Sequence, residues 1–334
     1  MTFFSQNHIR SPLQRLDDER LEAHNIRLFL KRDDQLHPSV SGNKFRKLKH
    51  NLAEMQHLGN VGLITFGGAF SNHIHATAAA GQLLNLPTVG IIRGQRPPVL
   101  SPTLVFSESC GMVLQFVSRS DYRDKNLIFK NLAQQYPNYY WLPEGGTNAF
   151  AMLGAAELVP EIIEDLGAQP DYICLACGTG GTTAGIVSAA ATLPKPISVI
   201  GFSALKGNFL EHDVFELLKQ YKNAFYTEGG KTISDLEFRI SDLSATNRNW
   251  AIQTDYHFGG YAKWTPPLID FINDFKQKHA IALDPVYTGK MLFGVFDLIE
   301  RGFFPKNTTI VAVHTGGLQG IEGFNQRFGG LVTT

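Results

Sequence analysis

The chain has 334 residues, so two domains are the default expectation. Hydrophobic residues make up 43% and charged residues 18%, which is typical of a globular protein and excludes a largely disordered one. Thirty basic and thirty acidic residues cancel, so no overall field favours nucleic acid or an anionic membrane as a partner. We expect no signal peptide in Met1 to Arg10 and no membrane span, and therefore a cytoplasmic protein.

Short β-rich runs alternate with helical patterns over most of the chain. The predicted strands are residues 26–31, 61–66, 88–93, 112–117, 139–142, 172–177, 198–203 and 309–314. The predicted helices are residues 43–58 and 72–84, one that ends near Tyr136, and one from Thr182. Such alternation predicts an α/β fold of mainly parallel sheets with helices on both faces. Residues 206–258 show a mixed pattern, and no element is predicted there.

The cysteines do not form a disulfide framework. Cys174 and Cys177 lie in the predicted strand 172–177, where residues three apart point to opposite faces. We therefore interpret them as two small buried side chains and expect no metal or redox site.

The segment from Gly178 to Thr182 connects a predicted strand to a predicted helix. Free N–H groups in the first helical turn, the positive dipole end and the threonine hydroxyls suit a phosphate. The segment lacks the Lys of a Walker loop, and Thr183 stands where a dinucleotide fingerprint needs its third glycine. The strand that follows ends at Ser203 without an Asp or Glu for a ribose. The alternative is a tight turn with no ligand, and we favour a small phosphate.

Lys44 lies at the start of a predicted amphipathic helix, after the capping signal Ser41-Gly42-Asn43. Neighbouring cations and partial burial lower an ammonium pKa and leave a nucleophilic amine near neutral pH. The alternative is a solvated helix face. Together with the phosphate segment, Lys44 suggests an enzyme built around a phosphorylated aldehyde cofactor.

Three predicted strands run into glycine-rich turns, at residues 66–68, 178–181 and 314–317. In open α/β sheets ligands bind beyond the carboxyl ends of the strands, so these turns could face one cleft. Ser71-Asn72-His73 follows the first turn and opens a predicted helix. It is either a plain N-cap or a pocket for a substrate carboxylate.

Six motifs occur in an order that resembles the pyridoxal-phosphate (PLP) enzymes of the 1-aminocyclopropane-1-carboxylate deaminase and D-cysteine desulfhydrase family. The motifs are residues 41–47, Gly67-Gly68-Ala69-Phe70-Ser71-Asn72-His73, Pro143-Glu144-Gly145-Gly146, residues 178–182, Asp284-Pro285-Val286-Tyr287-Thr288-Gly289-Lys290, and His314-Thr315-Gly316-Gly317. The resemblance implies a two-domain fold like that of the tryptophan synthase β subunit. Residues 47–152 would form a smaller inserted domain, and residues 1–46 and 153–334 the large PLP-binding domain.

The resemblance also implies roles for single residues. Lys44 would join the cofactor as an imine and act in catalysis. Residues Gly178, Thr179, Gly180, Gly181 and Thr182 would hold the phosphate, and Asn72, Thr288 and Thr315 would lie near the cofactor ring. Ser71, Asn72 and His73 would take the substrate carboxylate. Ser71, Tyr261 and Tyr287 would act on the substrate side, and the enzyme would be a homodimer.

One position departs from the family's pattern, because Phe70 stands where the family usually has a glutamine just before the Ser-Asn pair, and an aromatic side chain there could reshape the substrate pocket. Two positions depart from the pattern of the deaminases: Thr288 replaces a glutamate near the pyridine nitrogen, and Thr315 replaces an apolar residue. A threonine cannot supply the charge that keeps the pyridine nitrogen protonated, so the ring should be a weaker electron sink. Such a ring should suffice for β-elimination, where the leaving group takes the electrons.

We therefore expect a lyase that releases pyruvate, ammonia and sulfide from D-cysteine or a related β-substituted D-amino acid. The first alternative is a 1-aminocyclopropane-1-carboxylate deaminase that gives 2-oxobutyrate and ammonia. The second is a catalytically silent amino-acid-binding protein, against which the presence of Lys44 argues. An NAD dehydrogenase ranks last because the dinucleotide fingerprint is missing.

Overall fold

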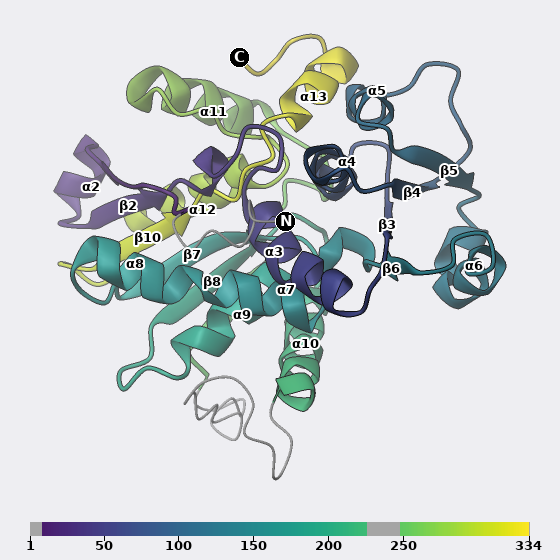
Figure 1. Ribbon diagram of the computed structural model, residues 1–334. Coiled ribbons are helices and arrows are strands. Elements are labelled where there is room, and N and C mark those ends of the chain that lie inside the picture. Colours follow the sequence, from purple (N-terminus) through teal and green to yellow (C-terminus); the bar gives the residue numbers. More distant parts are fainter. Residues whose placement is uncertain (1–8, 226–247, 334) are drawn as a thin grey trace.

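The computed structural model describes residues 9–225 and 248–333 (Figure 1). Two segments of the sequence analysis lie partly outside the described residues. They are residues 1–8, where we expect no signal peptide, and residues 226–247, which belong to the segment without a predicted element. The strands are β1 (Leu13–Leu16), β2 (Arg27–Lys31), β3 (Gly62–Gly67), β4 (Thr88–Arg93), β5 (Val113–Val117), β6 (Tyr139–Trp141), β7 (Tyr172–Cys177), β8 (Ser198–Ser203), β9 (Trp250–Gln253) and β10 (Thr309–Val313).

Helices alternate with these strands along the chain. The α-helices are α2 (Glu19–Ala23), α3 (Asn43–His57), α4 (Asn72–Leu84), α5 (Pro102–Ser109), α6 (Lys125–Leu132), α7 (Ala149–Ala156), α8 (Leu158–Leu166), α9 (Gly181–Ala190), α10 (Phe209–Phe225), α11 (Pro266–His279), α12 (Thr288–Glu300) and α13 (Gly320–Phe328). Short 3-10 turns are η1 (Asp33–Gln35), η2 (Asp121–Arg123) and η3 (Glu144–Gly146).

The larger sheet has the order β1-β2-β10-β7-β8-β9, and only β1 pairs antiparallel to its neighbour. Alternate residues of its central strands enter two separate cores, as the two-residue period of a strand requires. Cys174 packs with helices α2, α11, α12 and α13, and Cys177 packs with α7, α8, α9 and α10. Because the two side chains enter different cores, their predicted divergence is confirmed. Both thiols are free and buried.

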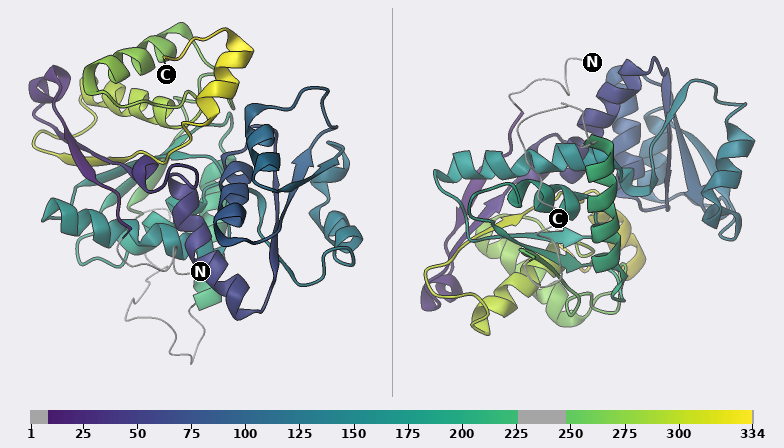
Figure 2. Two further views of the ribbon diagram at one scale, coloured as in Figure 1. Left: turned by 45° about the horizontal axis from the view of Figure 1, so that its top comes forward. Right: turned by 90° about the horizontal axis from the view of Figure 1, so that it is seen from below.

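The smaller sheet has the order β5-β4-β3-β6 and is entirely parallel. Helices α3 and α4 bury apolar side chains against one face, and Tyr122 and Ile128 pack against the other. Both views of Figure 2 show this part of the chain as a lobe beside the larger one. Its strands come from residues 62–141, inside the predicted insertion 47–152, whose limits stay a prediction.

The predicted α/β class with parallel sheets is confirmed, and all eight predicted strands are present with shifts of one residue at some ends. The edge strands β1 and β9 were not predicted, and neither were the helices α2, α5, α7, α8, α10, α11, α12 and α13. No helix in residues 9–225 and 248–333 combines the length and apolar composition needed to cross a membrane.

A buried ionic network fixes helix α3 to the larger lobe. Arg46 Nε donates to Asp33 Oδ2 at 2.7 Å, and its Nη1 donates to Glu161 Oε2 on α8 at 2.9 Å. Helix α7 crosses α3 closely, because a Cβ on Gly154 would lie 2.0 Å from the carbonyl oxygen of Arg46. The start of α3 therefore has a defined position, and Lys44 is its second residue.

Candidate active site

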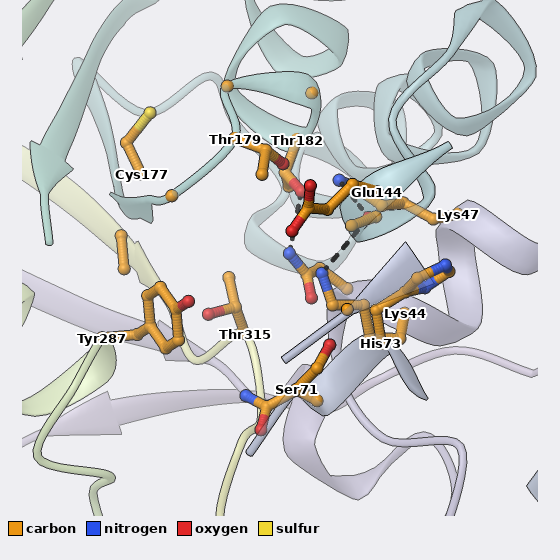
Figure 3. Close-up of a pocket in the computed structure, with 18 of the residues that line it drawn as sticks. Lys44, Lys47, Ser71, His73, Glu144, Cys177, Thr179, Thr182, Tyr287 and Thr315 are labelled. Atoms are coloured by element: carbon orange, nitrogen blue, oxygen red, sulfur yellow. Dashed lines mark hydrogen bonds between the residues drawn. The ribbon is translucent and has the colours of Figure 1, made fainter. Parts of the chain in front are cut away.

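A cavity of about 250 Å³ lies where the two lobes meet, with walls from both. The turns after β3, β7 and β10 all reach it, which confirms that the three glycine-rich turns face one cleft. Most of the predicted site residues line it: Lys44, Ser71, Asn72, His73, Gly178, Thr179, Gly180, Gly181, Thr182, Tyr261, Tyr287 and Thr315. Figure 3 shows Tyr287 on the side of the cavity opposite Lys44 and Lys47.

Lys44 projects from the first turn of α3 into this cavity. Its Nζ lies 3.5 Å from the carbonyl oxygen of Gly145, a long contact that leaves the amine weakly held. Burial disfavours the charged form and lowers the pKa of Lys44 to about 8. A fraction of the amine is therefore neutral, and nucleophilic, near physiological pH.

Lys47 is a second lysine of the cavity and was not among the predicted site residues. Its Nζ donates to Gly145 O at 3.1 Å and to Thr147 Oγ1 at 3.0 Å. Burial, and then the charge of Lys44, hold the pKa of Lys47 well below its usual range. The sequence did contain a signal, because positions three apart on a helix share a face, and Lys47 follows Lys44 at that spacing.

The turn from Gly178 to Thr182 forms the cavity wall next to Lys47. Gly180 caps α9 with φ of 78°, and the first N–H groups of α9 have no helical acceptor. Thr179 Oγ1 lies 2.7 Å from Thr147 Oγ1, and Thr182 Oγ1 accepts from Asn43 Nδ2 at 2.9 Å. These groups gather hydrogen-bond donors at a helix N-terminus.

A side chain on Gly181 would block this wall. Its Cβ would lie 2.8 Å from Thr147 Cγ2 and 3.1 Å from Lys47 Nζ, closer than ordinary contacts. With a helix N-terminus, threonine hydroxyls and the amino group of Lys47 around it, the space fits a phosphate. Lys44 supplies the amine that an aldehyde requires, so the residues present fit a phosphorylated aldehyde.

The start of helix α4 forms another wall. Ser71 Oγ caps the helix by accepting from the N–H of Ile74 at 3.3 Å. Asn72 Oδ1 accepts from Gln319 Nε2 at 2.9 Å, which ties α4 to the segment before α13. His73 Nε2 lies 2.7 Å from Thr65 Oγ1, whereas its buried Nδ1 has no partner among the described residues.

Two tyrosines form a further part of the cavity wall. Tyr261 and Tyr287 meet edge to face, with ring centroids 6.3 Å apart. Burial is the main cause that raises the pKa of both phenols, so both carry their proton at neutral pH. Lys290 Nζ donates to the carbonyl oxygens of His257 and Gly260 at 2.8 and 2.7 Å, which fixes the loop that presents Tyr261.

Thr288 is the one predicted site residue that does not line this cavity. Its side chain is fully buried, and its hydroxyl donates to Asp284 Oδ2 at 2.7 Å. The carboxylate of Asp284 also accepts from the N–H groups of Val286, Tyr287 and Thr288. The Asp284 carboxylate thus binds the N–H groups at the start of α12, and Thr288 holds that carboxylate in place, whereas Thr315 reaches the cavity.

Comparisons with known proteins agree with this geometry. The family model described as "Pyridoxal-phosphate dependent enzyme" matches residues 4–316. A bifunctional D-cysteine desulfhydrase/1-aminocyclopropane-1-carboxylate deaminase of Arabidopsis thaliana is 30% identical over 95% of this chain and 79% of that protein. A D-cysteine desulfhydrase of Klebsiella pneumoniae is 28% identical over 92% of this chain and 91% of its own length.

A crystal structure of a homologue of 1-aminocyclopropane-1-carboxylate deaminase superposes with a TM-score of 0.80 and 25% identity, covering 99% of this chain and 98% of that one. A cystathionine β-synthase of Helicobacter pylori shares the fold at a TM-score of 0.64 and 16% identity, over 95% of both chains. The chain belongs to the pyridoxal-phosphate dependent enzymes, and its relatives there include 1-aminocyclopropane-1-carboxylate deaminases and D-cysteine desulfhydrases.

Proposed function

We propose that this enzyme catalyses β-elimination from D-cysteine or a related β-substituted D-amino acid and releases pyruvate, ammonia and sulfide. The observation that carries the proposal is one cavity that joins a weakly held lysine, a phosphate-sized cradle and a polar helix start. The relatives named D-cysteine desulfhydrase support the choice of substrate.

Lys44 would hold the cofactor, and Lys47 with the turn from Gly178 to Thr182 would hold its phosphate. When bound, pyridoxal phosphate withdraws electrons from the substrate's α-carbon, so the α-proton becomes acidic. Lys44 Nζ is the base that takes this proton, since its lowered pKa of about 8 lets it gain and lose a proton near neutral pH.

The substrate carboxylate would lie at the start of α4. Ser71 Oγ and the first N–H groups of that helix are donors for an anion, and the helix dipole favours negative charge there. Tyr261 and Tyr287 keep their protons, so either phenol could donate one to a departing sulfur. Thr288 stands where the deaminases have a glutamate, so this position supplies no carboxylate to the cofactor ring, which suits elimination.

Reduction of the purified holoenzyme with borohydride, followed by peptide mapping, should label Lys44. Incubation with D-cysteine should yield pyruvate and sulfide in equal amounts, and the variant Lys44→Ala should yield neither while its fold is retained. Wild-type protein loaded with cofactor that releases no pyruvate from any β-substituted D-amino acid would refute the proposed function.

The deaminase reaction remains the second candidate, because the Arabidopsis relative carries both names. It predicts 2-oxobutyrate and ammonia from 1-aminocyclopropane-1-carboxylate, in an assay that contains no cysteine. A protein that binds amino acids with a change of cofactor absorbance, but converts none, would support the catalytically silent alternative.

We also propose the domain limits given above, a cytoplasmic location and a homodimer. The free buried thiols of Cys174 and Cys177 suit a reducing compartment. The resemblance to the family supports the dimer, and sedimentation equilibrium would test it.

A further inference from the structure

A second, smaller cavity of about 60 Å³ adjoins the active-site cavity. Four residues line both cavities, namely Phe70, Asn72, Tyr261 and Tyr287. We call the smaller cavity the side pocket. Beyond the shared residues its wall is mainly carbon, from Val286, Gly323, Phe324 and Phe328 among others.

Phe70 and Gly323 form a close contact across the two lobes. Phe70 comes directly before the cap residue of α4, and Gly323 lies in α13. A Cβ on Gly323 would lie 2.9 Å from two carbons of the Phe70 ring, which is closer than real contacts allow. The ring therefore takes its place against α13 only because position 323 has no side chain.

The two charged side chains that line the side pocket, Asp284 and Arg327, already have partners. The carboxylate of Asp284 accepts from three backbone N–H groups and from Thr288. The guanidinium of Arg327 lies 5.1 Å from the ring centroid of Phe328 at the exposed rim. The side pocket thus offers a guest mainly apolar contact, which suits an alkyl group better than a thiol.

The side pocket is next to the place where the substrate carboxylate is proposed to bind. Ser71 and Asn72 follow Phe70 in the chain, and consecutive Cα atoms are about 3.8 Å apart. The β-substituent of a substrate whose carboxylate binds at Ser71 would therefore lie close to the Phe70 ring. A water-sized site needs roughly 10–15 Å³, so the side pocket has room for about four to six heavy atoms.

We propose that the side pocket holds the β-substituent of an S-alkyl-D-cysteine, and that such thioethers are better substrates than D-cysteine itself. This inference rests on the proposed function. In the net reaction the thioether and one water give a thiol, pyruvate and ammonia. The carbon–sulfur bond breaks with its electron pair on sulfur, the sulfur takes up a proton, and no oxidant or reductant is needed.

The first test compares kcat/KM of the holoenzyme for S-propyl-D-cysteine and for D-cysteine, by pyruvate release. The sulfur and its propyl group supply four heavy atoms, and three buried carbons favour the thioether by up to about fiftyfold. We expect the ratio of kcat/KM for S-propyl-D-cysteine to kcat/KM for D-cysteine to be at least about ten. A ratio near one would overturn the inference and leave the proposed function intact.

Variants locate the effect. Gly323→Leu fills the side pocket and should lower the ratio about tenfold or more. Phe70→Gln removes its aromatic wall and should lower it as well, which keeps the test available if Gly323→Leu does not fold. Phe303→Gln is the matched control, because Phe303 is 48% exposed, comparable with 40% for Phe70, and lines neither cavity. An unchanged ratio in both side-pocket variants would contradict the inference.

Binding without elimination separates the two proposals. D-2-aminoheptanoate has the shape of S-propyl-D-cysteine but no leaving group, and D-alanine lacks the substituent. Titration followed by cofactor absorbance should show tighter binding of D-2-aminoheptanoate, and Gly323→Leu should abolish that preference. This result would support the side pocket even if no substrate released pyruvate, an outcome that refutes only the proposed elimination.

Discussion

Replacing Gly42 with alanine tests whether the position of α3 sets the activity. Gly42 precedes α3 with φ of 66° and ψ of −147°, a conformation that is essentially confined to glycine. A Cβ there would lie 1.9 Å from the carbonyl oxygen of Thr315 and 2.7 Å from the N–H nitrogen of Gly316. Both are backbone atoms, so no side-chain rotation can relieve the overlap.

The expected loss in the free energy of unfolding of Gly42→Ala has three parts. The backbone conformation of Gly42 costs about 1–3 kcal/mol for an alanine. Overpacking adds about 1–3 kcal/mol, because the backbones must separate by about 1 Å. The same movement lengthens the hydrogen bond from the N–H of Asn43 to Thr315 O, now 3.2 Å, worth about 1 kcal/mol. We therefore expect Gly42→Ala to lower the free energy of unfolding by at least about 3 kcal/mol.

Gly59→Ala is the matched control at the other end of the same helix. Gly59 has φ of 70°, but a Cβ there meets no atom within 4 Å. Gly59→Ala should therefore lower the free energy of unfolding, measured with urea, by only about 1–2 kcal/mol. Displacement of Lys44 by about 1 Å should also reduce pyruvate formation about a hundredfold in Gly42→Ala, measured at saturating cofactor. Equal stability loss and equal turnover in the two variants would refute the reasoning.

Three further predictions concern α3. Lys47→Met should weaken cofactor binding roughly ten- to hundredfold, the value of one charge-assisted hydrogen bond, as measured by equilibrium dialysis. Arg46→Ala leaves the buried carboxylates of Asp33 and Glu161 without their partner and should cost about 3–5 kcal/mol in urea unfolding, whereas an unchanged midpoint would contradict the network. Cofactor loading of the apoprotein should speed up as pH rises towards the pKa of Lys44 at about 8 and level off above it. Because that pKa is depressed in the folded state from 10.5, the unfolded chain binds more protons, so apoprotein stability should rise between pH 8 and 10.5.

The strands of the smaller sheet and the interior strands of the larger sheet were predictable from the sequence, whereas the two edge strands of the larger sheet were not. Strands β7 and β8 are apolar runs with turns at both ends, and the predicted bounds match the observed ones. In contrast, β1 and β9 have four residues each and mixed polarity, so no period of two could be recognised. Helix α10 did carry a signal, since its buried residues Leu210, Val214, Leu218 and Tyr221 follow a helical spacing.

Single site residues differ in how far local sequence could place them. The turn at Gly178 and the helix starts at Lys44 and Ser71 have local signatures, and all three line the cavity. Thr147 reaches Lys47 from a segment with no phosphate-binding pattern, so only the tertiary structure reveals it. Thr288 illustrates the opposite case, because its hydroxyl accepts from the N–H of Asp284 and donates to the Asp284 carboxylate, and these local bonds take it away from the cavity.

Two lysines on one face of α3 raise the question of which one reacts with the cofactor. Lys47 already donates to Gly145 O and Thr147 Oγ1, so covalent reaction would break two hydrogen bonds in a buried place. Among the described residues, Lys44 Nζ has only the 3.5 Å contact with Gly145 O to lose. The neutral form of Lys44, which is the form that reacts with an aldehyde, does not repel a charged Lys47. A charged Lys47 is the form that binds a phosphate best, so a neutral, reactive Lys44 and phosphate binding at Lys47 should reinforce each other.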